Sequence, residues 1–433
     1  MSAAVSIVGA MSEDNSPGPQ WAPMAGDEFS RRVAHADAVR GVFSASMNRL
    51  TEQADAEARA WFEATDPASY VGSRHHTVPR FLLERWANDR DQVRVFRRIE
   101  NRFDTCNIRD LAITDFYTVI DVEGRKNSMM ESLLGVVEAS TKPIIDDLLS
   151  PWSSAPITRD DIARIAQFAS FQATRTTRRR REIELHAEWY YKTMAQGLVP
   201  EAELRRLGVA PHQNELVELT SKSAENVMPF FACRPLALVR LDTPRLFICD
   251  EPVVLNAPVG AFHLEDCFLT DEDIATRMAK YLRKTKKRKR GRHPPPGRVV
   301  HFSSTAPAGF GTADEILLAI SPSGALLWGP LEDRPPTRPI ERLHLTGAEA
   351  DRFAGMANAG MSAQALDWVV GRIADNTFEG HTFPPTGPLM RVCDGTNAAS
   401  LAVNEPPDRF RPVRLRVPTA EELAASSTAN LSR

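Results

Sequence analysis

The sequence has no uninterrupted apolar run of about 18 residues, the length that a membrane-spanning helix requires. Its first residues include no basic segment, and Ser and Gly interrupt their apolar stretch, which argues against a cleaved secretory signal. The five cysteines are odd in number, lie far apart and form no C-x-x-C pair. This spacing disfavours a disulfide framework or a thiolate zinc site. We therefore expect a cytoplasmic protein without membrane contact.

The sequence also lacks the short motifs of several enzyme classes. It has no G-x-x-x-x-G-K phosphate-binding loop, no G-x-G-x-x-G dinucleotide fingerprint, no G-x-S-x-G nucleophile turn and no H-E-x-x-H zinc helix. The sequence therefore does not support a P-loop nucleotide-binding protein, a Rossmann dehydrogenase, a serine hydrolase of the G-x-S-x-G type or an H-E-x-x-H metalloprotease. Any chemistry must therefore depend on other residues.

What the chain does contain is an ordinary globular composition with one strongly basic segment. Hydrophobic residues make up 42% of the 433 residues and charged residues 25%, which excludes a wholly disordered or collagen-like chain. The net charge is only −3, yet eight cations, Lys286, Lys287 and Arg288 among them, fall within residues 283–292. Long-range attraction to nucleic acid would come from this segment and not from the whole surface.

Composition along the chain indicates four parts. Residues 1–28 are rich in Ser, Pro, Gly and Ala without periodicity, so we expect a disordered tail. An N-terminal helix is predicted over 29–72 and a core domain over 73–375, followed by an irregular C-terminal tail over 376–433. Within the core, residues 283–298 combine the basic run with consecutive prolines, which predicts an exposed, mobile loop.

The periodicity of the core predicts an α+β fold. Apolar residues at helical spacing indicate a helical layer over 127–230, including one long helix over 158–196 that starts with a hydroxyl cap. Short alternating or apolar runs predict a mainly antiparallel sheet over 236–330. A last helix over 347–374 and the His-His-Thr-Val-Pro segment at 75–79 are expected to pack on that sheet.

Four segments, taken in order, resemble one family. They are Arg74–Leu83 followed by Trp86, Thr114–Tyr117 with Glu131 and Glu138, Phe168–Gln172 with Arg175 and Arg178, and Phe247–Val254 with Ile320–Pro322. This order is similar to the bacterial domain-of-unknown-function family 4238, whose members open with H-x-V-P-x-F-x-L and later carry an S-D-N-P-V-like strand end. The resemblance spans about 74–372 and implies an architecture and candidate positions, but no reaction.

The chain departs from the family pattern at two positions of the later motif. Cys249 stands where the family usually has Ser, and Glu251 stands where it usually has Asn. A role that needs a hydroxyl or an amide at these positions is therefore not expected here.

Two adjacent histidines form the first candidate element of a site. His75 and His76 precede Pro79, which suits the first turn of a helix, so they lie on a turn near unpaired backbone N–H groups. Such a place suits anion binding or general-base chemistry. Neighbouring side chains diverge, so one of the two, His76, is expected to point inward with Val78 and Phe81. The alternative is a histidine that hydrogen-bonds to the backbone and closes the turn.

Asp250 is the second candidate because it ends a predicted strand just before a proline turn. A carboxylate in this place can act as a catalytic or metal-binding acid, or it can accept from the N–H groups of the turn. Glu251 adds a second carboxylate, although successive side chains on an extended chain point apart.

Arg175 is the third candidate, because an apolar helix face leads directly to it. Arg178 shares that face. A guanidinium in this position must be paired or face a cavity, and its planar shape suits a carboxylate or a phosphate. A buried pair with Asp250, Glu131 or Asp115 is the structural alternative.

Two functional hypotheses follow from these residues. In the first, the protein is a hydrolase or transferase that acts on a phosphate ester or nucleic acid, with or without a divalent metal ion. The catalytic candidates are His76, Asp250 and Arg175, and the substrate-binding candidates are His75, Tyr117, Arg178, Lys286, Lys287 and Arg288. In the second, the protein binds nucleic acid or an acidic partner through residues 283–292 without catalysis. No metal-ligand set is assigned.

Overall fold

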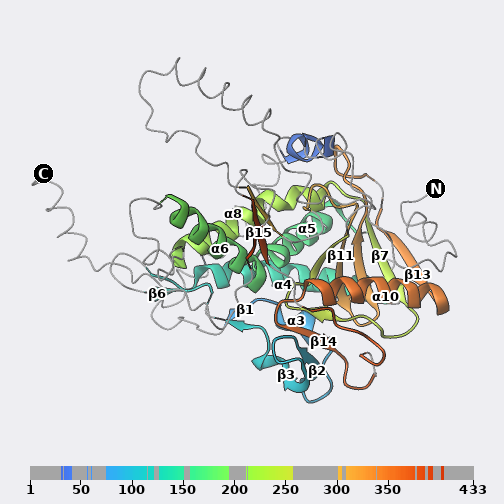
Figure 1. Ribbon diagram of the computed structural model, residues 1–433. Coiled ribbons are helices and arrows are strands. Elements are labelled where there is room, and N and C mark those ends of the chain that lie inside the picture. The colour runs from blue at the N-terminus through green and yellow to red at the C-terminus, as the bar shows by residue number, and fades with distance from the viewer. Residues whose placement is uncertain are drawn as a thin grey trace, which may run out of the picture.

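The computed structural model in Figure 1 describes most of the predicted core and short stretches outside it. The described residues are 31–32, 34–40, 56, 60, 75–114, 116–120, 126–150, 157–194, 211, 213–256, 301–304, 309–337, 339–375, 378–385, 389–393 and 401–403. The predicted tail at 1–28 and the basic loop at 283–298 lie outside them.

A group of helices forms one part of the molecule and lies beside the larger sheet (Figure 1). Its members are α4 (Met129–Leu149), α5 (Arg159–Thr174), α6 (Thr177–Met194) and α8 (Gln213–Ala232). Helix α5 starts as the sequence predicts, because Thr158 accepts from the Asp161 N–H and Asp161 accepts from the Thr158 N–H. Its apolar face is buried through Ile165, Phe168 and Phe171.

The larger sheet has the strand order β13-β7-β12-β11-β9. Its strands are β7 (Leu236–Leu241), β9 (Val253–Asn256), β11 (Glu315–Ser321), β12 (Gly324–Trp328) and β13 (Glu341–Leu345). All neighbours pair antiparallel except β13 and β7, which are parallel. Strands β7, β11 and β12 are buried along almost their whole length, so this sheet forms the centre of the core.

A second sheet, with the order β3-β2-β14-β8, joins segments from three distant parts of the chain. Its strands are β2 (Gln92–Arg97), β3 (Arg102–Asn107), β8 (Ile248–Cys249) and β14 (Trp368–Gly371). All its neighbours pair antiparallel. Strand β3 lies at one edge, and its side chains are largely exposed or half-buried.

The remaining elements are short, apart from one helix. They are β1 (His75–His76), α3 (Arg80–Leu83), η2 (Ile108–Asp110), β4 (Ile113–Thr114), β5 (Val119–Ile120), β6 (Lys126–Asn127), β10 (His301–Ser304), α10 (Gly347–Gln364), β15 (Met390–Cys393) and β16 (Leu401–Val403). Helix α10 lies directly on β9, since a Cβ on Gly360 would come within 2.6 Å of Val254. Only glycine permits this approach.

Residues 75–86, which we call the opening segment, are held beside the second sheet by a buried tryptophan that contacts the residues just before β8. Trp86 is fully buried, and its indole N–H donates to the carbonyl of Leu246 at 2.8 Å. Strand β1 pairs with β4, and the Thr77 N–H donates to the carbonyl of Ala112 at 3.0 Å. These bonds place the two histidines at a fixed position beside the helical layer.

The structure confirms the α+β class, a mainly antiparallel sheet and most of the predicted elements. The helix predicted over 158–196 is wrong in one respect, because it is interrupted at residues 175–176 and continues as α6. The helix predicted over 347–374 ends at Gln364, and strand β14 follows. The first error arises because good helix formers follow the break, and the second because the apolar residues of β14 continue the spacing of α10.

Other differences concern elements whose partners are remote in sequence. Strands β3 and β13 were not predicted, since their side chains are mostly polar and exposed. Strands β15 and β16 lie in the segment expected to be irregular, and both belong to a sheet with β10. No helix among the described residues is long and apolar enough to cross a membrane.

One buried arginine holds the end of the larger sheet together. Arg234 follows α8 and is fully buried, and burial lowers the pKa of its guanidinium to about 10. The guanidinium donates to the backbone carbonyls of Phe310 at 2.9 Å, Ala313 at 2.7 Å, Asp314 at 3.2 Å and Gly329 at 2.6 Å. The side chain thus joins the segment before β11 to the residue after β12.

Replacing this arginine is expected to destabilise the fold strongly. The Arg234→Met substitution keeps an unbranched apolar stem but leaves four carbonyls without their donor, so we expect a loss of about 3–5 kcal/mol in the free energy of unfolding. Urea denaturation measures it. The matched control is Arg342→Met, because Arg342 is exposed, and it should change stability by no more than about 0.5 kcal/mol. Equal effects of the two substitutions would contradict the anchoring role.

Candidate functional site

His75 lies at the inner end of the opening segment and contacts Tyr117. The side chain is buried, and its Nδ1 accepts a hydrogen bond from the backbone N–H of Tyr117 at 3.1 Å. The two rings lie 5.3 Å apart between centroids. An Nδ1 that accepts a hydrogen bond carries no proton, so the neutral ring holds its proton on Nε2.

His76 takes the less buried position of the pair. Along the extended segment, His75 and Thr77 are almost completely buried while His76 is half-buried. The sequence favoured His76 as the inward residue, and the structure gives the deeper position to His75. The difference arises because the β1–β4 pairing sets the alternation of side chains, which the local sequence does not show.

Arg175 occupies the interruption between α5 and α6. Its backbone ends α5, and its side chain is 2% exposed. The guanidinium Nη2 donates to Glu138 Oε1 at 2.7 Å. With its carboxamide oxygen facing the guanidinium, Gln172 accepts from Nη2 at 2.6 Å and from Nε at 3.1 Å. Burial opposes the charged form, but Glu138 outweighs it and raises the pKa of Arg175.

The expected partner of Arg175 was Asp250, Glu131 or Asp115, and the ion pair is made with Glu138. Glu138 lies seven residues after Glu131, two turns along the same face of α4. Arg175 also acts on Glu131 electrostatically. Both glutamates therefore belong to the surroundings of one guanidinium.

Tyr117 connects the histidine to this ion pair. Its side chain is buried, its N–H donates to His75, and its hydroxyl donates to the carbonyl of Arg175 at 3.1 Å. Burial raises the pKa of the Tyr117 phenol well above its usual range, so the hydroxyl stays protonated at neutral pH. We call the set His75, Tyr117, Glu131, Glu138, Gln172 and Arg175 the Arg175 network.

The first turn of α4 contributes polar atoms to this network that remain unused. Ser128 and Glu131 have the spacing of a capping box, yet the Ser128 side chain makes no capping hydrogen bond. Ser128 Oγ, Ser132 Oγ and Glu131 Oε2 are buried and have no hydrogen-bond partner within the described part of the chain. Burial is the main cause that raises the pKa of Glu131 to about 7, and Glu138 adds to it while Arg175 opposes it.

Asp250 and Glu251 form a second group, which binds backbone. The Asp250 carboxylate is 1% exposed and accepts from the N–H groups of Leu366 at 3.1 Å and Asp367 at 2.6 Å. Glu251 Oε1 accepts from the Arg178 N–H at 2.8 Å. Burial raises the pKa of both carboxyls, that of Asp250 to about 7 with a further contribution from Asp367. Asp250 therefore joins β8 to the turn between α10 and β14.

Arg178 belongs to this second group and not to the Arg175 network. Its Nη1 donates to the carbonyl of Gln364 at 3.1 Å, and its Nε donates to Glu182 at 3.3 Å. The sequence placed Arg175 and Arg178 on one helix face, but the interruption between them directs the two guanidiniums to different partners. The segment 175–178 thus links the two groups.

The structure brings together His75, Tyr117 and Arg175 of the predicted site residues. Asp250 and Arg178 lie in the second group, and Lys286, Lys287 and Arg288 lie outside the described residues. Within the described ranges no three His, Cys, Asp or Glu residues are grouped so that they could hold a metal ion. The sequence analysis gave no role to Ser128, Glu138 and Gln172. The Ser-x-x-Glu start of α4 and the spacing of seven residues between its two glutamates are the features that could have identified Ser128 and Glu138.

These features define an α+β protein with a buried arginine–glutamate network between its opening segment and its helical layer. Residues 74–261 match the model of the family described as protein of unknown function (DUF4238). The match includes every member of the Arg175 network and all three residues of the second group, Asp250, Glu251 and Arg178. Neither a curated protein nor a solved structure matches the chain.

The second group yields a stability prediction. In Asp250→Ala the N–H groups of Leu366 and Asp367 lose their acceptor inside the protein, so we expect a loss of about 2–5 kcal/mol in the free energy of unfolding. Urea denaturation at one fixed pH measures it, with the exposed Asp89→Ala as the matched control. If Asp250→Ala were as stable as Asp89→Ala, the carboxylate would not hold this turn.

Proposed function

We propose that this protein is a hydrolase or transferase that acts on a phosphate ester at the Arg175 network. The observation that carries the proposal is the group of buried, unpartnered polar atoms at the start of α4, next to the Arg175–Glu138 ion pair. Buried polar groups in folded proteins almost always have a hydrogen-bond partner, and a bound polar group is one explanation for those that lack a partner within the protein. The start of a 21-residue helix favours a negatively charged one.

Four residues of the network or of the adjoining start of α4 suit particular roles toward a phosphate. The hydroxyls of Ser128 and Ser132, which have no partner within the described residues, would donate to its oxygens. Arg175 would stabilise negative charge from the interior. His75, with its proton on Nε2, would act as a hydrogen-bond donor to the substrate, in keeping with the substrate-binding role predicted from the sequence.

Glu131 is the group best suited to act as a general acid. With a pKa of about 7, its carboxyl is substantially protonated at neutral pH, unlike an ordinary glutamate. A protonated acid can give its proton to the oxygen of the departing alcohol when the P–O bond breaks, while water or an acceptor hydroxyl takes the phosphoryl group.

The ion pair extends from the interior toward the surface. The Arg175 side chain is 1% exposed and that of Glu138 is 26% exposed. Glu138 is therefore the member of the pair that lies nearer to solvent.

The proposal predicts the effect of Glu131→Gln on turnover. The amide keeps the shape of the side chain but cannot act as an acid, so kcat should fall by about 10²–10⁴ for phenyl phosphate, whose leaving group needs a proton. The loss should be smaller for p-nitrophenyl phosphate, because p-nitrophenolate leaves readily without one. Release of inorganic phosphate measures both rates. Bis-p-nitrophenyl phosphate and DNA are further substrates that test whether the protein also cleaves phosphate diesters.

The pH dependence provides the check on this role. Protonated Glu131 is the active form, so kcat/KM of the wild type should fall as the pH rises through about 7, and Glu131→Gln should lose this limb. The exposed Glu84→Gln is the matched control and should retain the wild-type profile. A rate that rises through the same pH range, or equal losses for the two leaving groups, would refute the acid role.

The alternative is nucleic-acid binding without catalysis through residues 283–292, where eight of ten residues are basic. The segment lies outside the described residues, so it stays a prediction. Salt-sensitive binding of DNA or RNA in the absence of turnover on any ester would favour it over the enzyme.

A further inference from the structure

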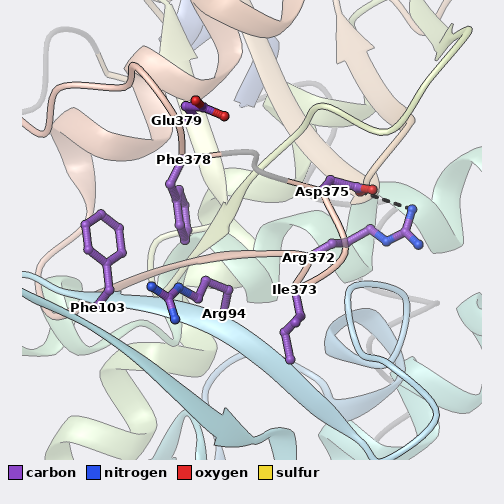
Figure 2. A pocket seen from close by; sticks show the side chains of 7 residues that line it. All are labelled: Arg94, Phe103, Arg372, Ile373, Asp375, Phe378 and Glu379. Carbon is purple, nitrogen blue, oxygen red and sulfur yellow. Dashed lines mark ion pairs between the residues drawn. The ribbon is translucent and has the colours of Figure 1, made fainter.

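A cavity of about 520 Å³ lies between the β2–β3 hairpin and the segment that follows β14. Arg94 of β2 and Phe103 of β3 form one side, and Arg372, Ile373 and Phe378 come from the other segment. Figure 2 shows Phe378 pointing toward the side chains of Arg94 and Phe103, with Arg372 paired to Asp375 on the far side. The cavity shares no residue with the Arg175 network.

Exposed apolar side chains concentrate around this cavity. Among the described residues, the large hydrophobic side chains that are clearly exposed are Ile99 at 55%, Phe103 at 44% and Ile373 at 39%. Two of the three line the cavity, and Ile99 lies in the turn of the same hairpin. Exposed apolar surface that gathers in a concave place marks a binding site more often than scattered exposed residues do.

The aromatic side of the cavity is rigid. Phe103 packs against Phe96 with ring centroids 5.1 Å apart and against Phe378 at 5.5 Å. Phe378 in turn packs against the buried Phe247 at 4.8 Å. These contacts hold the two cavity-lining rings in place, so a flat ligand would meet a preformed apolar wall and would not need to order it.

Arg94 supplies a positive charge that is not neutralised. Its guanidinium carbon lies 5.4 Å from the centre of the Phe103 ring. No carboxylate of the described residues forms an ion pair with it, whereas Arg372 is neutralised by Asp375 at 3.1 Å. Glu379 lies at the rim and is exposed. Arg94 is also exposed, and among the described residues that line the cavity it is the cation without an ion pair, so its charge is available to a ligand.

We propose that this cavity binds a small aromatic anion, with its ring against Phe103 and Phe378 and its acidic group on Arg94. A planar guanidinium binds a carboxylate through two parallel hydrogen bonds, and the same guanidinium above an aromatic ring also attracts a second flat ring. The volume of about 520 Å³ lies in the range of small-molecule pockets, roughly 300–1,000 Å³. The ligand class is thus an aromatic carboxylate or a compound of similar charge and shape.

Calorimetric titration of the full chain with three probes tests the two parts of this chemistry. 1-Naphthoate has both the ring and the charge, 1-naphthalenemethanol has the ring without the charge, and cyclohexanecarboxylate has the charge without the aromatic ring. We expect saturable one-to-one binding of 1-naphthoate, and binding at least about tenfold weaker for each of the other two.

Variants assign the binding to this cavity. Arg94→Gln should weaken 1-naphthoate at least about tenfold and weaken 1-naphthalenemethanol much less, because the neutral probe loses only the attraction between the guanidinium and its ring. Ile373→Ser should weaken both aromatic probes, because it removes apolar surface from the wall. Arg102→Gln is the matched control, since Arg102 lies on the same hairpin, is exposed and pairs with Glu100. The thermal midpoint of each variant verifies that it is folded.

The proposal is overturned by an absence of saturable 1-naphthoate binding to the wild type. It is also overturned if Arg94→Gln and Arg102→Gln have the same effect, or if the neutral alcohol binds as tightly as the carboxylate. The test needs no turnover, so its outcome is independent of the phosphate-ester proposal.

Discussion

Burial of one guanidinium, that of Arg175, determines how the helical layer is joined to the segment that carries His75. Moving a charged guanidinium out of water costs several kcal/mol, and the cost is offset only when its donors have well-placed acceptors. Glu138 and Gln172 provide these acceptors from α4 and α5, while Tyr117 donates to the carbonyl of the same residue. The need for acceptors around the buried guanidinium therefore fixes α4 against α5. The hydrogen bond between Tyr117 and His75 brings the segment with His75 next to Arg175.

The segment 175–178 also connects the helical layer to the two sheets. Three residues after Arg175, the Arg178 N–H donates to Glu251, and the neighbouring Asp250 accepts from the turn that precedes β14. Because β14 lies between β2 and β8, this contact reaches the second sheet and the hairpin that forms the aromatic cavity. The interruption of the helix at 175–176 thus connects the helical layer to both candidate sites. The Arg175 network lies at the interruption itself, and the aromatic cavity is reached through hydrogen bonds and through strand pairing in the second sheet.

The sequence predicts elements that depend on local spacing and does less well where partners are remote. The helical layer over 127–230 follows from apolar periodicity and the start of α5 follows from a local cap, so both were predicted, although the helix over 158–196 is interrupted. The interruption at Arg175 was missed because good helix formers follow it, and β14 was missed because its apolar residues continue the pattern of α10. The pairing with Glu138 depends on how two helices pack, which no local pattern contains. Residue types indicated an arginine that needs a partner, but not which partner.

A double-mutant cycle on the ion pair tests the central claim most directly. The free energy of unfolding is measured for the wild type, Arg175→Met, Glu138→Gln and the double variant. Each single substitution leaves a charged or polar partner without its counterpart, so the double variant should lose less than the sum of the two, with a coupling of about 2 kcal/mol or more. Losses that add to within about 0.5 kcal/mol would contradict the claim, because Arg175 would then be held in place by something other than Glu138.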